Sequence, residues 1–167
     1  MNVNLLQRCW RHVVTHPKWA LRWWLPTAAL AAIEQSVAGA ERQHGGEIRV
    51  ALEASLSLQN IFAGLTSRQR ARQIFAELEV WNTDARNGVL LYVCWADRAV
   101  EIIADRGLNA AVSEAEWAKV CTQMQEACSA GRYQQGICNA VQLIGQLMAR
   151  QYPVPDINEL TDRPALL

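Results

Sequence analysis

Apolar residues are densest in the middle of the chain, where their pattern predicts two adjacent strands. Residues 89–95 (Val-Leu-Leu-Tyr-Val-Cys-Trp) are uncharged and rich in β-favouring side chains, which is typical of a strand buried on both faces. After the polar break Ala96-Asp97-Arg98, residues 100–104 resume the strand pattern, and Asn87-Gly88 is a chain-reversal signal before the first strand. The pattern therefore predicts a central hairpin that needs other elements packed on both of its faces.

Most of the remaining chain has helical periodicity. Pro26 favours a helix start, and apolar residues then recur at helical spacing until Gly45-Gly46. Residues 66–69 and 113–116 both resemble capping boxes, and a last helix is predicted over residues 133–151. Residues 47–53 alternate between apolar and charged side chains, which predicts a half-exposed strand.

The predicted order is helix, strand, helix, strand, strand, helix, helix. A strand, a crossover helix and a second strand favour a parallel pair, to which the hairpin adds an antiparallel strand. We therefore predict an α/β fold, a three-layer α/β/α sandwich with a small mixed sheet. The expected organisation is a basic, tryptophan-rich N-terminal segment over residues 1–26, an α/β domain over residues 27–152, and a flexible, proline-containing tail over residues 153–167.

Charge and cysteine content narrow the functional classes. Lys and Arg total 16, as do Asp and Glu, so no overall attraction to nucleic acid is expected. Residues 1–33 contain four basic residues and no acidic one, which leaves the rest of the chain with a net charge of −4. Five cysteines without a CxxC pair favour reduced core residues over disulfides or a zinc site. No apolar run reaches the length of a membrane span, which is about 20 residues. We therefore expect a cytoplasmic protein, with any membrane contact being peripheral and at the inner face.

At the hairpin, the residues resemble the TPM domain, a small α/β/α domain of thylakoid-lumen photosystem repair proteins and many bacterial envelope proteins. The elements that carry the resemblance are Gly-Glu-Ile-Arg-Val at residues 46–50, Ala-Arg-Gln-Ile-Phe at 71–75, Asn-Gly-Val-Leu-Leu at 87–91, Asp97-Arg98, Gly107-Leu108 and the capped helix after Ser113. The resemblance spans about residues 27–150 in element order. It looks closest to short, single-domain members without a signal peptide or membrane anchor.

The resemblance implies a range of functions and no catalytic residue. Some members are described as weak acid phosphatases, some bind calcium, and others are auxiliary or assembly factors for membrane complexes. Many members have Gly-Tyr-Gly-Leu where this chain has Asp105-Arg106-Gly107-Leu108. Many also have an acidic segment before the first helix, where this chain is basic and rich in tryptophan.

Four acidic residues are candidates for a metal site: Glu47, Asp97, Glu101 and Asp105. Carboxylates at strand ends and in adjoining turns can converge, and calcium or magnesium would use several such oxygens. Alternatively, Asp97 and Asp105 are turn residues and Glu101 is a solvated strand residue.

Two further groups of residues are candidates for binding. Glu41, His44, Arg49 and Glu53 form a polar cluster near a helix–strand junction, where His44 is either an acid–base group oriented by Glu41 or half of a surface pair. Trp19, Trp23, Trp24 and Arg22 are expected to contact a partner or a membrane, with packing on the chain's own core as the alternative.

These observations favour a non-catalytic interaction or assembly module that acts with membrane-associated protein partners. The alternative is a weak metal-dependent phosphatase that uses the clustered carboxylates. No G-x-S-x-G elbow, phosphate-binding loop or dinucleotide fingerprint is present in the sequence. The pattern leaves the oligomeric state open.

Overall fold

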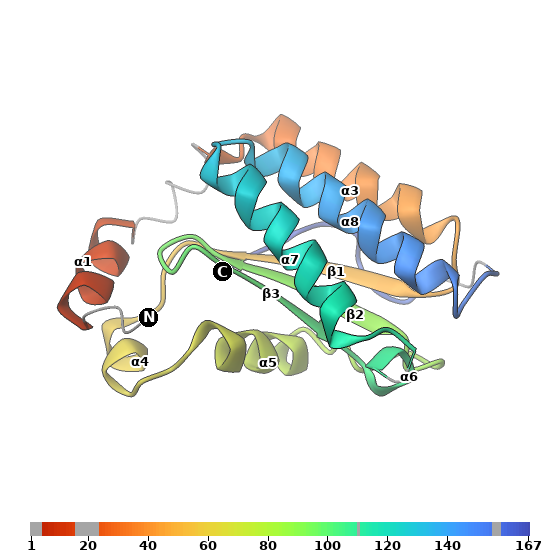
Figure 1. Cartoon of the computed structure of the whole chain (residues 1–167), viewed down its shortest axis with the longest axis horizontal. Coiled ribbons are helices and arrows are strands. Elements are labelled where there is room, and N and C mark those ends of the chain that lie inside the picture. The colour runs from red at the N-terminus through yellow and green to blue at the C-terminus, as the bar shows by residue number, and fades with distance from the viewer. Residues whose placement is uncertain (1–4, 16–23, 110, 155–157) are drawn as a thin grey trace.

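The computed structural model describes residues 5–15, 24–109, 111–154 and 158–167. A four-stranded sheet in the order β3-β2-β1-β4 lies between two layers of helices (Figure 1). The strands are β1 (Glu47–Glu53), β2 (Gly88–Cys94), β3 (Ala99–Ala104) and β4 (Ala165–Leu166). β1 pairs with β2 in parallel and β2 pairs with β3 in an antiparallel hairpin. The predicted mixed sheet and three-layer α/β/α fold are therefore confirmed.

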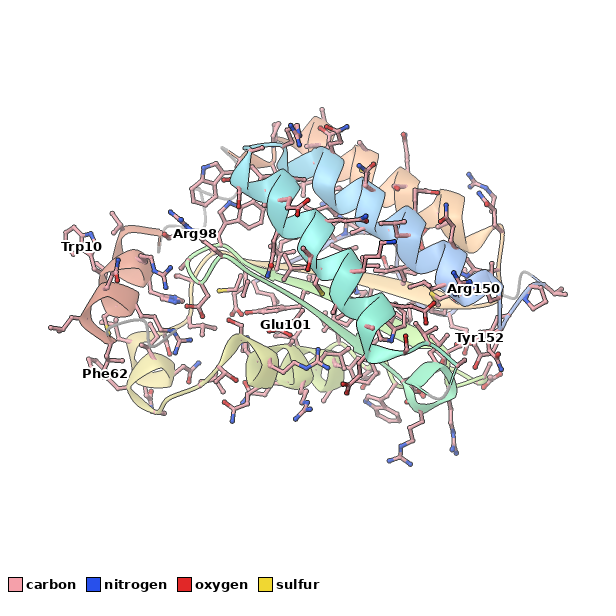
Figure 2. All side chains as sticks on the ribbon, viewed as in Figure 1. Trp10, Phe62, Arg98, Glu101, Arg150 and Tyr152 are labelled. Atoms are coloured by element: carbon pink, nitrogen blue, oxygen red, sulfur yellow. The ribbon has the colours of Figure 1, made fainter. Side chains whose placement is uncertain are left out.

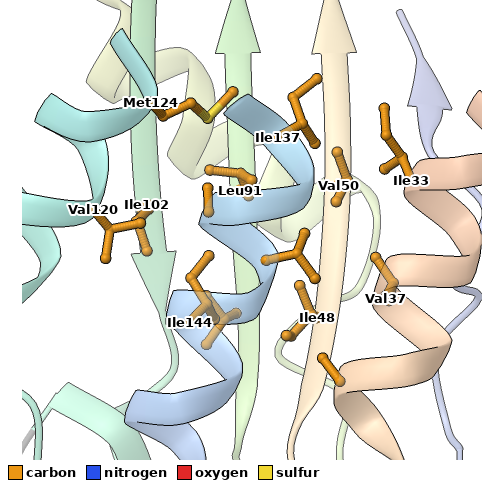
Figure 3. Close-up of a cluster of buried hydrophobic side chains, with 14 of the residues drawn as sticks. Ile33, Val37, Ile48, Val50, Leu91, Ile102, Val120, Met124, Ile137 and Ile144 are labelled. Atoms are coloured by element: carbon orange, nitrogen blue, oxygen red, sulfur yellow. The ribbon is translucent and has the colours of Figure 1, made fainter. Parts of the chain in front are cut away.

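Three long helices cover one face of the sheet (Figure 1). They are α3 (Thr27–Glu41), α7 (Glu114–Ser129) and α8 (Tyr133–Ala149). α3 begins after Pro26, and the predicted capping box between Ser113 and Glu116 begins α7. Aliphatic side chains of α3 and α8 fill the space above the strands, as Figure 3 shows for Ile33, Val37, Ile137 and Ile144 against Ile48, Val50 and Leu91.

The opposite face of the sheet packs on a smaller core. α5 (Ser67–Glu77) begins with the predicted capping box of Thr66 and Gln69, and it covers the outer residues of β2 and β3. A short helix, α4 (Leu58–Phe62), precedes it, and α1 (Leu5–Thr15) contacts α4 at one end of the sheet (Figure 1). A four-residue helix, α6 (Arg106–Asn109), follows β3.

β1 is buried along its whole length, so the prediction of a half-exposed strand was wrong. Its charged side chains, Glu47, Arg49 and Glu53, are all buried, and each has a hydrogen-bond partner. Arg49 donates to the backbone carbonyls of Thr161 (2.5 Å) and Arg163 in the C-terminal tail. Glu47 accepts from the backbone N–H of Leu160 at 3.0 Å. The alternation of charged and apolar residues in β1 therefore reflects buried polar contacts and not exposure of one strand face to water.

The C-terminal tail is also more ordered than expected. Its last residues form β4, which extends the sheet by pairing in parallel with Ala51 and Leu52 of β1. The prediction that residues 153–167 have no fixed structure was wrong for residues 158–167, because Arg49 and Glu47 bind the tail backbone through side chains that sequence alone assigned to solvent.

None of the helices in the described part of the chain has both the length and the apolar composition of a membrane span.

Candidate functional site

The hairpin turn between β2 and β3 holds a carboxylate, Asp97, that is bonded by three side chains. Asp97 accepts from Arg8 through Nε (2.9 Å) and Nη2 (2.8 Å), from the Ser67 hydroxyl (2.9 Å), and meets His12 Nε2 at 3.0 Å. Burial alone would raise the pKa of Asp97, but the hydrogen bonds from His12, Arg8 and Ser67 outweigh it and hold that pKa well below its usual range. Asp97 is therefore an anionic anchor at neutral pH.

The tautomer of His12 follows from its two contacts. Its ring is buried, and Nδ1 accepts a hydrogen bond from the backbone N–H of Leu56 at 2.9 Å. Nε2 must then carry the proton that it donates to Asp97. His12 thus links α1 to the chain before α4 and to the hairpin turn at once.

These contacts hold α1 to the domain by its polar face. Arg8 and His12 point inward to Asp97, while the apolar side chains of the same helix are exposed. Leu6 is 76% exposed and Trp10 is 68% exposed. An amphipathic helix of a globular domain normally turns its apolar stripe to the core, so α1 has the reverse orientation.

The exposed face of α1 adjoins exposed apolar residues of α4. Phe62 is 67% exposed, and Figure 2 shows Trp10 and Phe62 at the same end of the molecule, pointing away from the sheet. We call this set the α1–α4 apolar surface, and it comprises Leu5, Leu6, Trp10, Val13, Val14, Leu58 and Phe62.

The four predicted metal ligands do not converge. Asp97 lies in the hairpin turn, whereas Asp105 follows β3 at the opposite end of the hairpin and donates its N–H to the carbonyl of Gly88 at the start of β2. An antiparallel pair necessarily separates the residue after its first strand from the residue after its second. Glu101 pairs with Arg68 (3.3 Å) midway along β3.

Glu47, the fourth predicted ligand, is engaged by the C-terminal tail. Over the described ranges, no three His, Cys, Asp or Glu side chains are grouped to hold a metal ion. The described residues therefore do not fit the calcium or magnesium site that the resemblance implies, and the oxygens of Asp97 are already occupied by its cationic and hydroxyl partners.

The predicted polar cluster divides between the two ends of β1. At the amino end, Glu41 accepts from the backbone N–H of Ile48 (2.7 Å), and His44 Nδ1 accepts from the N–H of Gly46 (3.1 Å). Burial raises the pKa of Glu41 to about 9 and lowers the pKa of His44, so both are neutral at pH 7. The two side chains line a cavity of about 380 Å³ without bonding each other.

At the carboxyl end of β1, Glu53 accepts from the Tyr92 hydroxyl (2.5 Å) and from Arg70 Nε (3.1 Å). Arg49 lies between the two groups and binds the tail. The polar cluster thus comprises separate structural contacts, and His44 is a buried residue rather than half of a surface pair.

Three of the predicted partner contacts, Trp19, Arg22 and Trp23, lie outside the described residues. The fourth, Trp24, stacks on Trp95 with ring centroids 5.5 Å apart and planes 3° apart. The exposed residues of α1 were missed, although Leu6, Trp10, Val13 and Val14 recur at i, i+4, i+7 and i+8, a spacing that places them on one helical face.

Comparison with known proteins gives consistent results. The sequence profile of the TPM domain matches residues 24–147. The chain is similar to the BA42 protein from the psychrophilic bacterium Bizionia argentinensis, with 30% identity over 84% of this chain and 94% of that one and a TM-score of 0.75. It also shares its fold with the N-terminal domain of a P. gingivalis protein, at 16% identity and a TM-score of 0.61 over 81% of this chain and 83% of that one. None of the curated proteins compared matches the chain. α1 precedes the matched residues.

Proposed function

The chain belongs to the TPM domain family, and from that premise we propose that it is a non-catalytic interaction module that docks a protein partner on the α1–α4 apolar surface. The observation that supports this proposal is the orientation of α1. Arg8 and His12, on its polar face, bond to Asp97, and the apolar side chains of the same helix are exposed to solvent.

Leaving such a face exposed is unfavourable for a protein that works alone. Burial of apolar surface contributes about 25 cal/mol per Å² removed from water, and monomers seldom expose contiguous apolar patches larger than a few hundred Å². Large aromatic side chains near the centre of a patch are also the residues that dominate binding energy in protein interfaces. Trp10 and Phe62 have that chemistry, and the bonds of Arg8 and His12 to Asp97 hold the surface in place before a partner arrives.

The charges around this surface favour a protein partner over bare lipid. A helix that lies on anionic lipid keeps its cations beside its apolar face, where they meet headgroups. In α1, Arg8 and His12 turn away from that face and toward Asp97, and the Nη2 of Arg11 also lies 3.9 Å from that carboxylate. A membrane-associated partner would therefore recruit the chain through protein contacts.

The alternative, a weak metal-dependent phosphatase, has no comparable support. Such an enzyme needs carboxylates that converge around an open coordination position. Within the described part of the chain, Asp97 and Asp105 lie at opposite ends of the hairpin.

The test is quantitative co-purification of the full chain from its own cells. We expect Trp10→Ser combined with Phe62→Ser to remove a defined set of bound proteins, since both substitutions replace exposed apolar rings by a hydroxyl. Trp81→Ser is the matched control, because Trp81 is also exposed (52%) but lies after α5, outside the α1–α4 apolar surface. Equal recovery with all three forms would contradict the proposal.

A second arm separates protein from lipid. The wild-type chain should sediment with native membranes and remain in solution with protein-free vesicles made from the lipids of those membranes. Equal binding to the vesicles would show that lipid is the occupant, and the proposed protein partner would be wrong.

A further inference from the structure

A second candidate site lies where the parallel strands end. A cavity of about 630 Å³ opens beside the hairpin turn, between α1, the last turn of α7 and the first residue of α8. The carboxyl ends of parallel strands are where open α/β sheets bind ligands, and the volume falls within the range of small-molecule sites.

Three aromatic rings line one wall of this cavity. Trp24 and Trp95 stack in parallel, and the ring of Tyr133 lies 5.0 Å from that of Trp95 at 43°. Trp10 of α1 also lines the cavity. A stack of two parallel indoles offers further flat surface to a third ring, and aromatic pairs contribute beyond the area that they bury.

The described lining is cationic. It includes Arg11 and Arg98 and no acidic residue. The nearest carboxylate, Asp97, is saturated by Arg8, His12 and Ser67, and its closest approach to Arg11 is 3.9 Å.

With respect to the residues that the structure describes, the guanidinium groups of Arg11 and Arg98 both have N–H donors that are free to bind a ligand. The Nε of Arg11 is buried without a hydrogen-bond partner, and a buried donor without a partner is costly. Arg98 makes no ion pair with any described residue, and it has a φ of 52°, a left-handed conformation that favours glycine or asparagine over arginine. A cationic ligand would be repelled here, whereas an anion would meet two donors.

We propose that this cavity binds a flat aromatic anion, with its ring against Trp95 and Tyr133 and its acidic group between Arg11 and Arg98. This inference does not rest on the proposed docking function, although Trp10 and Val14 of the α1–α4 apolar surface also line the cavity. Most of its residues lie in the part of the chain that matches the family, and Phe62 of the docking surface does not line the cavity.

The test uses 1-naphthoate as the probe and the neutral isostere 1-naphthamide as its control, each titrated calorimetrically into the full chain. Naphthoate should bind at least about tenfold more tightly, because hydrogen bonds to an ionised group are roughly twice as strong as neutral ones. Arg98→Gln should remove most of that preference while leaving amide binding unchanged. Equal affinities for the two probes, or no binding of either, would overturn the proposal.

Two control variants locate the effect. Arg106→Gln removes an exposed arginine from α6, beyond the opposite end of the hairpin, and should leave naphthoate affinity unchanged. Phe62→Ser should also leave it unchanged, so that loss of partner docking and loss of anion binding are distinguishable. A thermal melt of each variant confirms folding, and the same loss in Arg106→Gln as in Arg98→Gln would show that only net charge matters, contrary to the proposal.

Discussion

Replacement of Asp97 by asparagine tests whether this carboxylate anchors α1. The substitution keeps the size of the side chain but removes its charge and replaces one acceptor oxygen by an NH2 donor. Three bonds to α1 depend on the two carboxylate oxygens, two from Arg8 and one from His12, so at least one of them is lost in either orientation of the amide. A hydrogen bond to a charged group contributes about 1.5–3 kcal/mol and a neutral one about 0.5–1.5, so each bond that persists loses about 1 kcal/mol and a lost bond costs more. The docking of α1 is therefore weakened by at least about 3 kcal/mol, or about 100-fold in its opening equilibrium.

Hydrogen exchange measures this opening directly, because amides exchange through local unfolding. In Asp97→Asn, the amides of α1 should exchange about 100-fold faster or more, while those of β1 and β2 keep their wild-type rates. Glu101→Gln is the control, since Glu101 pairs with a half-exposed Arg68 and surface pairs contribute about 0–1 kcal/mol. Unchanged exchange of α1 in Asp97→Asn would refute the anchoring role.

The pH dependence of this anchor has a definite sign. The pKa of Asp97 is lowered in the folded state, so its contribution is fully present above the ordinary aspartate value of about 3.9 and is lost only as the pH falls through the lower folded value. The contribution of Asp97 to the protection of α1, measured as the difference in exchange between wild type and Asp97→Asn, should therefore be constant between pH 5 and pH 7.

Three other predictions concern the rest of the fold. Burial raises the pKa of Glu41 to about 9 in the folded state, so the free energy of unfolding falls as the pH rises from the pKa of the unfolded chain toward 9. Glu41→Gln should therefore raise Tm relative to wild type by more at pH 8 than at pH 5. Arg49→Met should release the tail, seen as faster digestion by carboxypeptidase, because Arg49 donates to the carbonyl of Thr161; the same rate in both forms would contradict this. Gly88→Ala should destabilise by about 1–3 kcal/mol in denaturant unfolding, because its Cβ would lie 2.0 Å from the backbone oxygen of Val80, and an unchanged midpoint would show that this contact relaxes freely.

The sheet could be predicted from sequence because its signals are local. The uncharged run after Gly88 and the charged turn at Asp97 define the hairpin, and the capping boxes at Thr66 and Ser113 begin the helices where the structure has them. Each of these signals depends on residues within a few positions of one another.

The candidate sites could not be predicted because their contacts join distant residues. Arg8 and Asp97 are 89 positions apart, and Arg49 and Thr161 are 112 apart. A charged residue in an alternating strand is assigned to solvent unless its distant partner is known. The α1 part of the docking surface could be predicted nonetheless, because the spacing of Leu6 and Trp10 places them on one helical face. The sequence does not indicate that this face is exposed to solvent.

Site-specific photo-crosslinking in the chain's own cells tests the central claim most directly. A photoreactive phenylalanine analogue at position 10 places the reactive group on the α1–α4 apolar surface, and one at position 81 places it on an exposed site elsewhere. The account predicts a discrete protein adduct from position 10 that disappears when Phe62→Ser is added, and none of that size from position 81. The same adducts from both positions, or no adduct from position 10, would contradict it.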